Sequence, residues 1–367
     1  MSNNHSSPGL WALAWRRLCA DRIAMVALAV VGAFLLMLAL SASGLIVADW
    51  EDEVGVNYAP PTFIGADGAA EHGGPVKSAE AAVSAVNVLD PLADDIRQIK
   101  AEMGDAGAPV EMYGVSDPLG ADLAQIRAGM GKGKQGGALA KRDTLPFGAD
   151  KWGHDILKKT VKGAETSIVV GLVAALLAVV LGTVFGAFSG YFGGRTDDFF
   201  NWFYSIFTSI PSILMILTVA AVLQQKGVLT IVLILGLTGW TGPYRLIRAE
   251  YIKHKAREYV MAADAIGASH WRKMFSHIFP NVSHVALVQM SILVVGFIKA
   301  EVILSFLGFG VPVGMVSWGS MLNEAQNELI LGKWWQLTAA ALAMAVLVTA
   351  FSLFTDALRD ALDPKVK

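Results

Sequence analysis

Cysteine is almost absent from this chain, because Cys19 is the only one in 367 residues. No intrachain disulfide can form, and one thiol cannot supply the ligand cluster that a structural zinc ion requires. The seven histidines do not stand at metal-ligand spacing. The sequence therefore predicts no metal site and no cofactor bound by this chain.

Charge is also scarce, with 16% charged residues and a formal net charge of −2. Such a balance does not favour nucleic acid as a partner. Hydrophobic residues make up 54% of the sequence, and its mean hydropathy is +0.51. This composition predicts a polytopic membrane protein in contact with lipid rather than an ordinary soluble domain.

The motifs of catalysis and nucleotide binding are missing as well. The chain has no Gly-x-x-x-x-Gly-Lys-[Ser/Thr] segment, and its Ser, His and Asp residues form no recognisable catalytic group. A Gly-x-Gly-x-x-Gly match from Gly131 to Gly136 has no strand before it, so it does not predict a dinucleotide site. The chain is not expected to be an enzyme, and any ATP hydrolysis must come from a partner.

The sequence is rich in apolar segments that are long enough to cross a bilayer. The six expected spans are 24–47, 167–188, 199–223, 228–243, 283–305 and 335–354. Pro211 is expected to kink the third span, and the fourth should continue into a basic helix over 245–257. Residues 1–23 form a polar start and an interfacial helix with tryptophans and arginines. Residues 48–160 are rich in glycine, alanine and acids, and predict an extramembrane insertion with short helices at 79–88 and 91–103.

The stretch 257–281 is the most charged one between two apolar spans, and it predicts two short helices. Glu258 suits the positive end of the first helix, and Gly267 suits its left-handed end. Ser269 can cap the second helix. Its expected apolar stripe consists of Trp271, Met274, Phe275 and Ile278. Pro280–Asn281 should break the chain before the next span, and a solvated connection fits these residues as well as a functional loop does.

The spacing of Glu258, Ala262–Ala263, Gly267 and Pro280 resembles the EAA loop of ABC-importer permeases. The surrounding residues are similar to the dipeptide/oligopeptide/nickel branch, specifically its C-type permease subunit. The resemblance implies a coupling helix that docks into a groove of a cytoplasmic ATPase. Its matching residues are Glu258, Tyr259, Ala262, Ala263, Asp264, Gly267 and Pro280. His277 departs from the general pattern, where an aliphatic residue is usual.

The resemblance extends over roughly 146–367 and covers 48–145 hardly at all. The lead-in at 146–166 carries Ala149 and His154 where the branch usually has threonine and arginine. The turn at 190–198, the Gly/Pro-rich loop at 306–321 and the final residues also resemble the branch. These similarities imply an all-α type I importer permease fold with six transmembrane helices, a core permease domain over 161–367 and an insertion between the first two spans.

Lys299 and Glu301 are ionisable groups near the outer end of the fifth span, where such groups are costly. Snorkelling to the interface accounts for Lys299. Glu301 stands before the loop that contains Phe306 and Gly308, and these three are candidates for the translocation path or gate. A role for Glu301 in capping the outer loop is equally open.

Basic residues indicate the orientation, because short cytoplasmic loops are enriched in lysine and arginine. Most of them fall on one side of a six-span chain: the N-terminal segment, the 244–282 loop and the C-terminal tail. Both termini are therefore expected in the cytoplasm of a bacterium, with the protein in the inner membrane and the 48–160 insertion outside.

The function that the resemblance implies is that of a permease subunit in an ATP-driven peptide importer. Its implied partners are a second, homologous permease, two ATPase subunits that bind ATP and Mg²⁺, and an extracytoplasmic binding protein. Nickel or another small solute is an alternative cargo. A secondary transporter that works alone is the alternative from another class, although no inverted repeat is visible in the sequence.

Overall fold

The structure of the protein is a computed structural model, and it describes residues 10–65, 141–312 and 314–362. The short helices expected at 79–88 and 91–103 and the glycine-rich stretch around 131–136 lie outside the described residues. Within the described ranges the secondary structure is helical, with isolated β-bridges and no extended strand.

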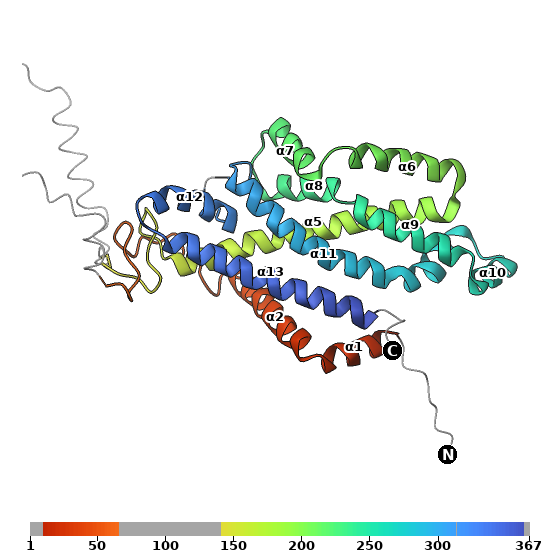
Figure 1. The fold of residues 1–367 in the computed structure, drawn as a ribbon, viewed down its shortest axis with the longest axis horizontal. Helices are drawn as coiled ribbons and strands as arrows, with labels where there is room; N and C mark the ends of the chain where they lie inside the picture. Colours follow the sequence, from red (N-terminus) through yellow and green to blue (C-terminus); the bar gives the residue numbers. More distant parts are fainter. Residues whose placement is uncertain (1–9, 66–140, 313, 363–367) are drawn as a thin grey trace, which may run out of the picture.

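The helices follow one another along the chain in the order of their labels (Figure 1). Their bounds are α1 (Leu10–Ala20), α2 (Arg22–Ala42), α5 (Ile156–Phe192), α6 (Gly194–Thr208), α7 (Ser212–Leu223), α8 (Val228–Thr238), α9 (Thr241–Lys255), α10 (Glu258–Ala265), the π-helix η2 (Arg272–Ile278), α11 (Phe279–Phe306), α12 (Trp318–Ile330) and α13 (Trp335–Leu362).

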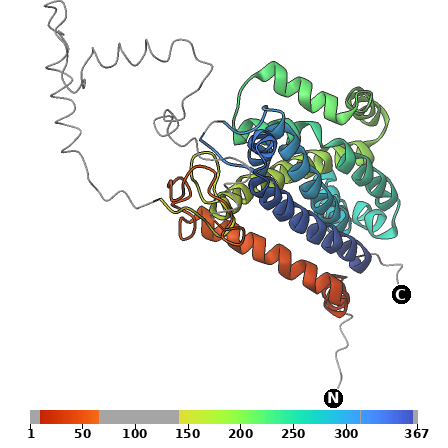
Figure 2. The ribbon, with the colours of Figure 1, turned by 60° about the vertical axis from the view of Figure 1, so that its left-hand side comes forward.

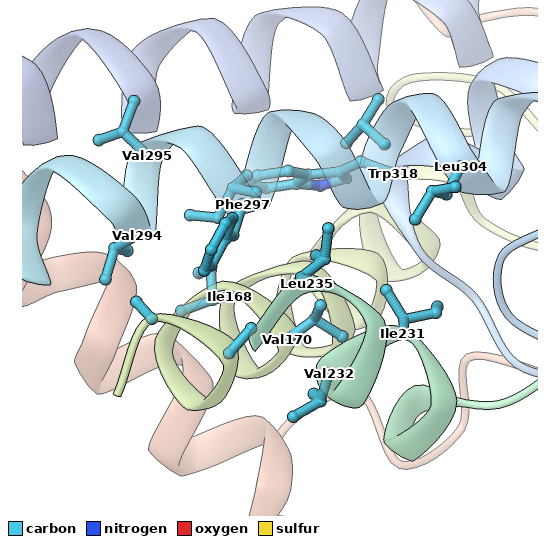
Figure 3. Packing of buried hydrophobic residues seen from close by; sticks show 14 of the residues in the cluster. Ile168, Val170, Ile231, Val232, Leu235, Val294, Val295, Phe297, Leu304 and Trp318 are labelled. Carbon is cyan, nitrogen blue, oxygen red and sulfur yellow. The ribbon is translucent and has the colours of Figure 1, made fainter. Parts of the chain in front are cut away.

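The 37-residue helix α5 runs through the middle of the bundle and packs against α8, α9 and α11 (Figure 1). Apolar side chains from these helices form the main core, where Phe297 of α11 faces residues such as Ile168 of α5 and Leu235 of α8 (Figure 3). Trp318, at the start of α12, is fully buried in the same cluster. The core therefore joins segments that lie far apart in the sequence.

Four continuous helical segments of the described residues are long and apolar enough to cross a membrane: α2, α5, η2 with α11, and α13. All four differ from their expected bounds of 24–47, 167–188, 283–305 and 335–354. The first span ends at Ala42 rather than at 47, because Gly44 takes a left-handed conformation and terminates α2. The second begins at the Asp155 cap and lasts until Gly193, so it is longer than 167–188 at both ends.

The third expected span is not a kinked helix but two helices, which corrects the prediction for Pro211. Helices α6 and α7 meet at an angle of 82°. Pro211 lacks a backbone N–H and its ring clashes with the preceding turn, so the helix stops at Thr208 and a new one starts at Ser212. The pair forms one broken span or a re-entrant segment.

The fourth expected span is also interrupted. Helix α8 has only 11 residues, or about 16 Å, which is short of the roughly 30 Å of a bilayer core. The chain then breaks at Gly239 and Trp240 before α9 begins. A Cβ atom on Gly239 would lie 2.3 Å from the ring of Phe297, so the break coincides with a close approach of α11. The basic helix ends at Lys255 rather than at 257.

Helix α12 begins within the segment 306–321, which the sequence predicted as a Gly/Pro-rich loop, and continues to Ile330. It begins with a capping box in which Ser317 and Ser320 satisfy each other's backbone N–H groups. The last helix, α13, continues eight residues beyond the expected limit of 354 and includes most of the tail. Both differences extend the helical part of the chain.

The two flanks of the expected insertion pair with each other and with the bundle. Bridges join Gly55 to Arg142 and Pro61 to Leu145. The indole N–H of Trp335 donates a hydrogen bond of 2.8 Å to the carbonyl of Ala149. We call residues 50–64 together with 141–155 the stem. It packs on the end of the bundle where α12 also lies (Figure 1).

The loop around α10 lies at the opposite end of the bundle from the stem and α12 (Figure 1). Helix α1 and the end of α13 pack together through Leu18, Ala361 and Leu362. Figure 2 shows both of them on the outside of the bundle, toward the end that carries α10. The first and last described helical turns therefore share an end with the expected coupling loop.

Candidate coupling site

Helix α10 begins at Glu258 and ends where the sequence predicted, at a left-handed glycine. Gly267 has φ +80°, and its N–H donates to the carbonyl of Asp264 over 2.9 Å. The N–H of Ala268 donates to the carbonyl of Ala263 over 3.0 Å. These two bonds form a complete Schellman motif, which explains why glycine stands at position 267.

The second short helix is a π-helix, and this changes its apolar face. A π-helix has more residues per turn than an α-helix, so side chains four apart stay aligned and those three apart do not. Met274 and Ile278 are fully buried, whereas Trp271 is 62% exposed and stacks on Phe275 at 5.6 Å. The expected single stripe is therefore wrong and divides into a buried pair and a surface pair.

The sequence predicted that Pro280 breaks the chain before the next span. This prediction is wrong, because Pro280 lies in the first turn of α11. The π-helix and α11 form one continuous helical segment, Arg272–Phe306. The coupling loop is thereby joined directly to a membrane span.

Side chains of α5 and α9 hold the loop against the bundle. The hydroxyl of Tyr251 donates to the carbonyl of Met274 over 3.2 Å, and both residues are buried. The hydroxyl of Tyr191 lies 2.9 Å from Nδ1 of His270. Within the loop, Lys273 forms an ion pair with Asp264. The loop is thus fixed to two long helices, and a displacement of α10 would act on both.

Most of the predicted coupling residues lie on the outer surface of this loop. Glu258, Tyr259, Ala262, Asp264 and Gly267 are exposed, and Pro280 is exposed at the start of α11. Ala263 is the exception, since it is one of the buried residues of α10. Two apolar side chains that the sequence did not single out, Met261 and Ile266, are 56% and 84% exposed. They add apolar contact area to a surface that nothing covers in the described chain.

Three glycines of α5 were missed as functional residues. Gly182, Gly186 and Gly190 recur every four residues and face the backbone of α9. A Cβ atom on any of them would lie 2.6–2.8 Å from a carbonyl oxygen of α9 or of Trp240, just before it. This small-residue spacing is a known signal of close helix packing in membranes. It could have revealed that the basic helix α9 packs closely against the long helix α5.

A charged network connects α6 to the same pair of helices. Arg248 of α9 donates two hydrogen bonds of 2.6 Å to the carboxylate of Asp197. Ser189 of α5 donates to the same carboxylate and lies 3.0 Å from the hydroxyl of Tyr244. The bidentate geometry fixes orientation as well as distance. Asp197 therefore ties the first turn of α6 to α5 and α9.

Glu301 is completely buried, and the structure places its carboxylate inside the chain. Ser167 and Ser305 each donate a hydrogen bond of 2.6 Å to it. Ser167 in turn accepts a bond of 3.3 Å from the backbone N–H of Trp318. Glu301 thereby joins α5, α11 and the start of α12. The other candidates for the path or gate are exposed: Phe306 is the last residue of α11 and Gly308 follows it, and Lys299 is exposed as well.

A second buried polar cluster, at the end of the bundle that carries the stem, was not predicted. The ammonium of Lys159 lies 2.7 Å from Asp150 and 2.6 Å from Glu324. His154, one of the departures from the family pattern, places Nδ1 2.9 Å from the same aspartate. Burial favours the neutral form of Asp150, but Lys159 and these hydrogen bonds outweigh it and hold its pKa below the usual range. The cluster connects the stem, α5 and α12.

Glu328 of α12 lies beside this cluster without sharing its bonds. Both of its carboxyl oxygens are buried and have no partner at normal hydrogen-bond geometry among the described residues, and the backbone N–H of Lys151 interacts with them only weakly. Burial raises the pKa of Glu328 to about 7, although the nearby Lys159 opposes the rise. The carboxyl is therefore poised to exchange a proton near neutral pH.

Two known protein families match this chain. Residues 182–367 match the family described as the inner membrane component of binding-protein-dependent transport systems. Residues 9–61 match the N-terminal transmembrane domain of oligopeptide transport permease C.

Several curated relatives are similar to the core of the chain. The oligopeptide transport system permease protein OppC of Bacillus subtilis is 38% identical over 221 residues, which cover 60% of this chain and 72% of the relative. The dipeptide transport system permease protein DppC of the same organism is 36% identical, with 60% and 69% covered. The peptidoglycan transport system permease protein YejE of Agrobacterium fabrum is 34% identical, with 60% and 57% covered.

The bundle, the coupling loop and these matches define a membrane-spanning permease of the ABC-importer class. The chain belongs to the family of inner membrane components of binding-protein-dependent transport systems. Within it, the additional N-terminal match identifies the C-type permease arrangement, a multi-pass protein of the inner membrane.

Proposed function

We propose that this chain is the permease subunit of an ATP-driven importer of di- or oligopeptides and that it couples to cytoplasmic ATPases through residues 257–281. The observation that carries the proposal is the exposed surface of α10, ended by the Gly267 motif and anchored to α5 and α9. The names of the relatives support peptides rather than nickel as the cargo.

The subunit works with a second, homologous permease, two ATPases that bind ATP and Mg²⁺, and an extracytoplasmic binding protein. Closure of the ATPases displaces α10, and the contacts of Tyr251 and Tyr191 transmit this displacement to α9 and α5. The close packing at Gly182, Gly186 and Gly190 makes these two helices a rigid pair. The permease itself supplies the path and no hydrolytic chemistry.

Uptake into proteoliposomes that contain the full complex tests this function. ATP inside the vesicles and peptide-loaded binding protein outside should drive accumulation of a labelled dipeptide or tripeptide. Accumulation of a nickel chelate in place of peptide would favour the alternative cargo. Peptide uptake that needs an ion gradient and neither ATP nor the ATPases would instead establish a secondary transporter.

A further inference from the structure

A basic cavity of about 860 Å³ opens beside the coupling loop, between α9, α11 and the end of α13. One face of α9 lines it with Leu246, Glu250, Lys253 and His254, and Arg257 follows directly. Asn281, His284, Val285, Val288 and Gln289 line it from α11, and Arg359 and Leu362 from α13. Arg257, Tyr259 and Asn281 belong to the stretch 257–281 to which coupling is assigned, whereas the other lining residues lie outside it.

Positive charge in the cavity exceeds negative charge. Glu250 is its only carboxylate, and Lys253 already pairs with it at 2.9 Å. Arg257 and Arg359 make no ion pair with any residue that the structure describes. Two guanidinium groups are thus left to bind an anion, and guanidinium groups suit phosphate in particular.

Polarity changes along the length of the cavity. Arg257, Asn281 and His284 lie toward the coupling loop, whereas Leu246 and Val288 lie further along their helices, toward the membrane. The helix rise separates the basic end from the apolar end by about 10–16 Å. This distance is comparable to that between a phospholipid phosphate and the upper part of its acyl chains.

We propose that this cavity binds one anionic phospholipid of the cytoplasmic leaflet, with its phosphate at Arg257 and Arg359 and its acyl chains along Leu246, Val285 and Val288. Charge complementarity selects the anion, and the apolar wall selects a lipid over free phosphate. Basic pockets between transmembrane helices at the cytoplasmic surface bind anionic headgroups for these reasons. The inference goes beyond transport of the cargo and uses only the proposed orientation.

Lipid retention by the purified, complete transporter tests the proposal. Phospholipids are extracted from the complex and counted by class, with phosphatidylglycerol as the probe lipid. The double variant Arg257→Gln/Arg359→Gln should bind phosphatidylglycerol about 30-fold more weakly, since each basic residue contributes about 1 kcal/mol. The control is Arg16→Gln/Arg195→Gln, which removes the same charge from two exposed arginines outside the cavity. It should retain the lipid as the native complex does.

A second measurement separates the lipid from other anions. Phosphatidylglycerol in phosphatidylcholine nanodiscs should raise the unfolding temperature of the native complex and not of the double variant. Inorganic phosphate added to phosphatidylcholine nanodiscs should have no such effect. Equal retention by both double variants, equal binding of phosphatidylcholine, or stabilisation by inorganic phosphate would overturn the proposal. So would loss of another subunit from the double variant, because the cavity would then be a protein contact. Peptide uptake is measured separately and does not decide this question.

Discussion

Gly267 shows how one residue can matter for coupling without contributing to the core. A Cβ atom there would meet nothing within 4 Å, so the only cost of a side chain inside this chain is the left-handed backbone with φ +80°. That cost is about 1–2 kcal/mol for an ordinary residue and is larger for a β-branched one. Fold and coupling should therefore respond differently to substitution at this position.

We expect Gly267→Val to reduce binding-protein-stimulated ATP hydrolysis by about tenfold or more, because the Schellman end of α10 becomes the minor conformation. The amount of inserted permease should stay near normal. Gly267→Asn is the matched control, since asparagine enters the left-handed region readily and should retain most of the stimulation. ATPase activity of the reconstituted complex measures both. Full stimulation of the valine variant would contradict the role assigned to this loop.

Glu328 gives a prediction about pH. Its folded-state pKa of about 7 lies above the ordinary value of 4.5, so the folded state binds the proton more tightly than the unfolded state does. The associated stability is fully present below about pH 4.5 and is lost as the pH rises through about 7. Glu328→Gln should therefore stabilise the protein at about pH 8.5, by on the order of 2–3 kcal/mol, and much less at about pH 5.

Thermal unfolding of the purified permease at both pH values measures this difference. Glu324→Gln is the control with the opposite sign, because Glu324 pairs with Lys159 at 2.6 Å and its loss should destabilise the protein at neutral pH. If Glu328→Gln destabilised the protein at alkaline pH, the buried carboxylate would have a partner that the described residues do not provide.

At the scale of helices, the contact between α5 and α9 depends on glycine. A methyl group on Gly186 would lie 2.8 Å from the carbonyl oxygen of Tyr244 and 3.0 Å from the backbone nitrogen of Arg248. Backbone atoms cannot rotate away as a flexible side chain can. Relief therefore requires the two helices to separate, which also strains the bond between Arg248 and Asp197.

Gly186→Ala should consequently destabilise the permease by about 1–3 kcal/mol, the usual cost of overpacking. Gly32→Ala in α2 is the control, since nothing lies within 4 Å of its added methyl group and alanine favours a helix. The two variants are compared by their unfolding temperatures in detergent. Equal temperatures would show that α5 and α9 pack more loosely than the structure indicates.

Packing between helices also bears on the helix breaks near Pro211 and Gly239. Sequence patterns predicted single spans at 199–223 and 228–243, but each of these stretches contains a change of direction. Pro211 carries a local signal, but its effect could be a kink or a stop, and surrounding packing decides between them. The break at Gly239 coincides with the close approach of Phe297 from a distant helix, which no local pattern reveals.

At the scale of the whole molecule, orientation is the remaining prediction. The basic α9 and α10 region should face the cytoplasm, and the stem should face the outside. In a Cys19→Ser background, a membrane-impermeant thiol reagent should label Asp143→Cys in intact cells and should not label Lys253→Cys. Both positions should react after permeabilisation, which serves as the control. Labelling of the Lys253→Cys variant in intact cells would reverse the assigned topology.

The sequence by itself determined the class of the protein, because hydropathy, turn residues and the spacing of Glu258, Gly267 and Pro280 are local properties. It also placed the end of α10 correctly, since a left-handed cap depends on one glycine. Only the tertiary structure decided how Glu301, Lys159 and Glu328 are used, which faces of η2 are buried, and where the stem packs. Several of these outcomes depend on side chains far apart in the chain, such as Ser167 with Glu301, 134 residues apart, and Lys159 with Gln336, 177 residues apart. No local pattern encodes such contacts, because they form only when separate helices and loops meet.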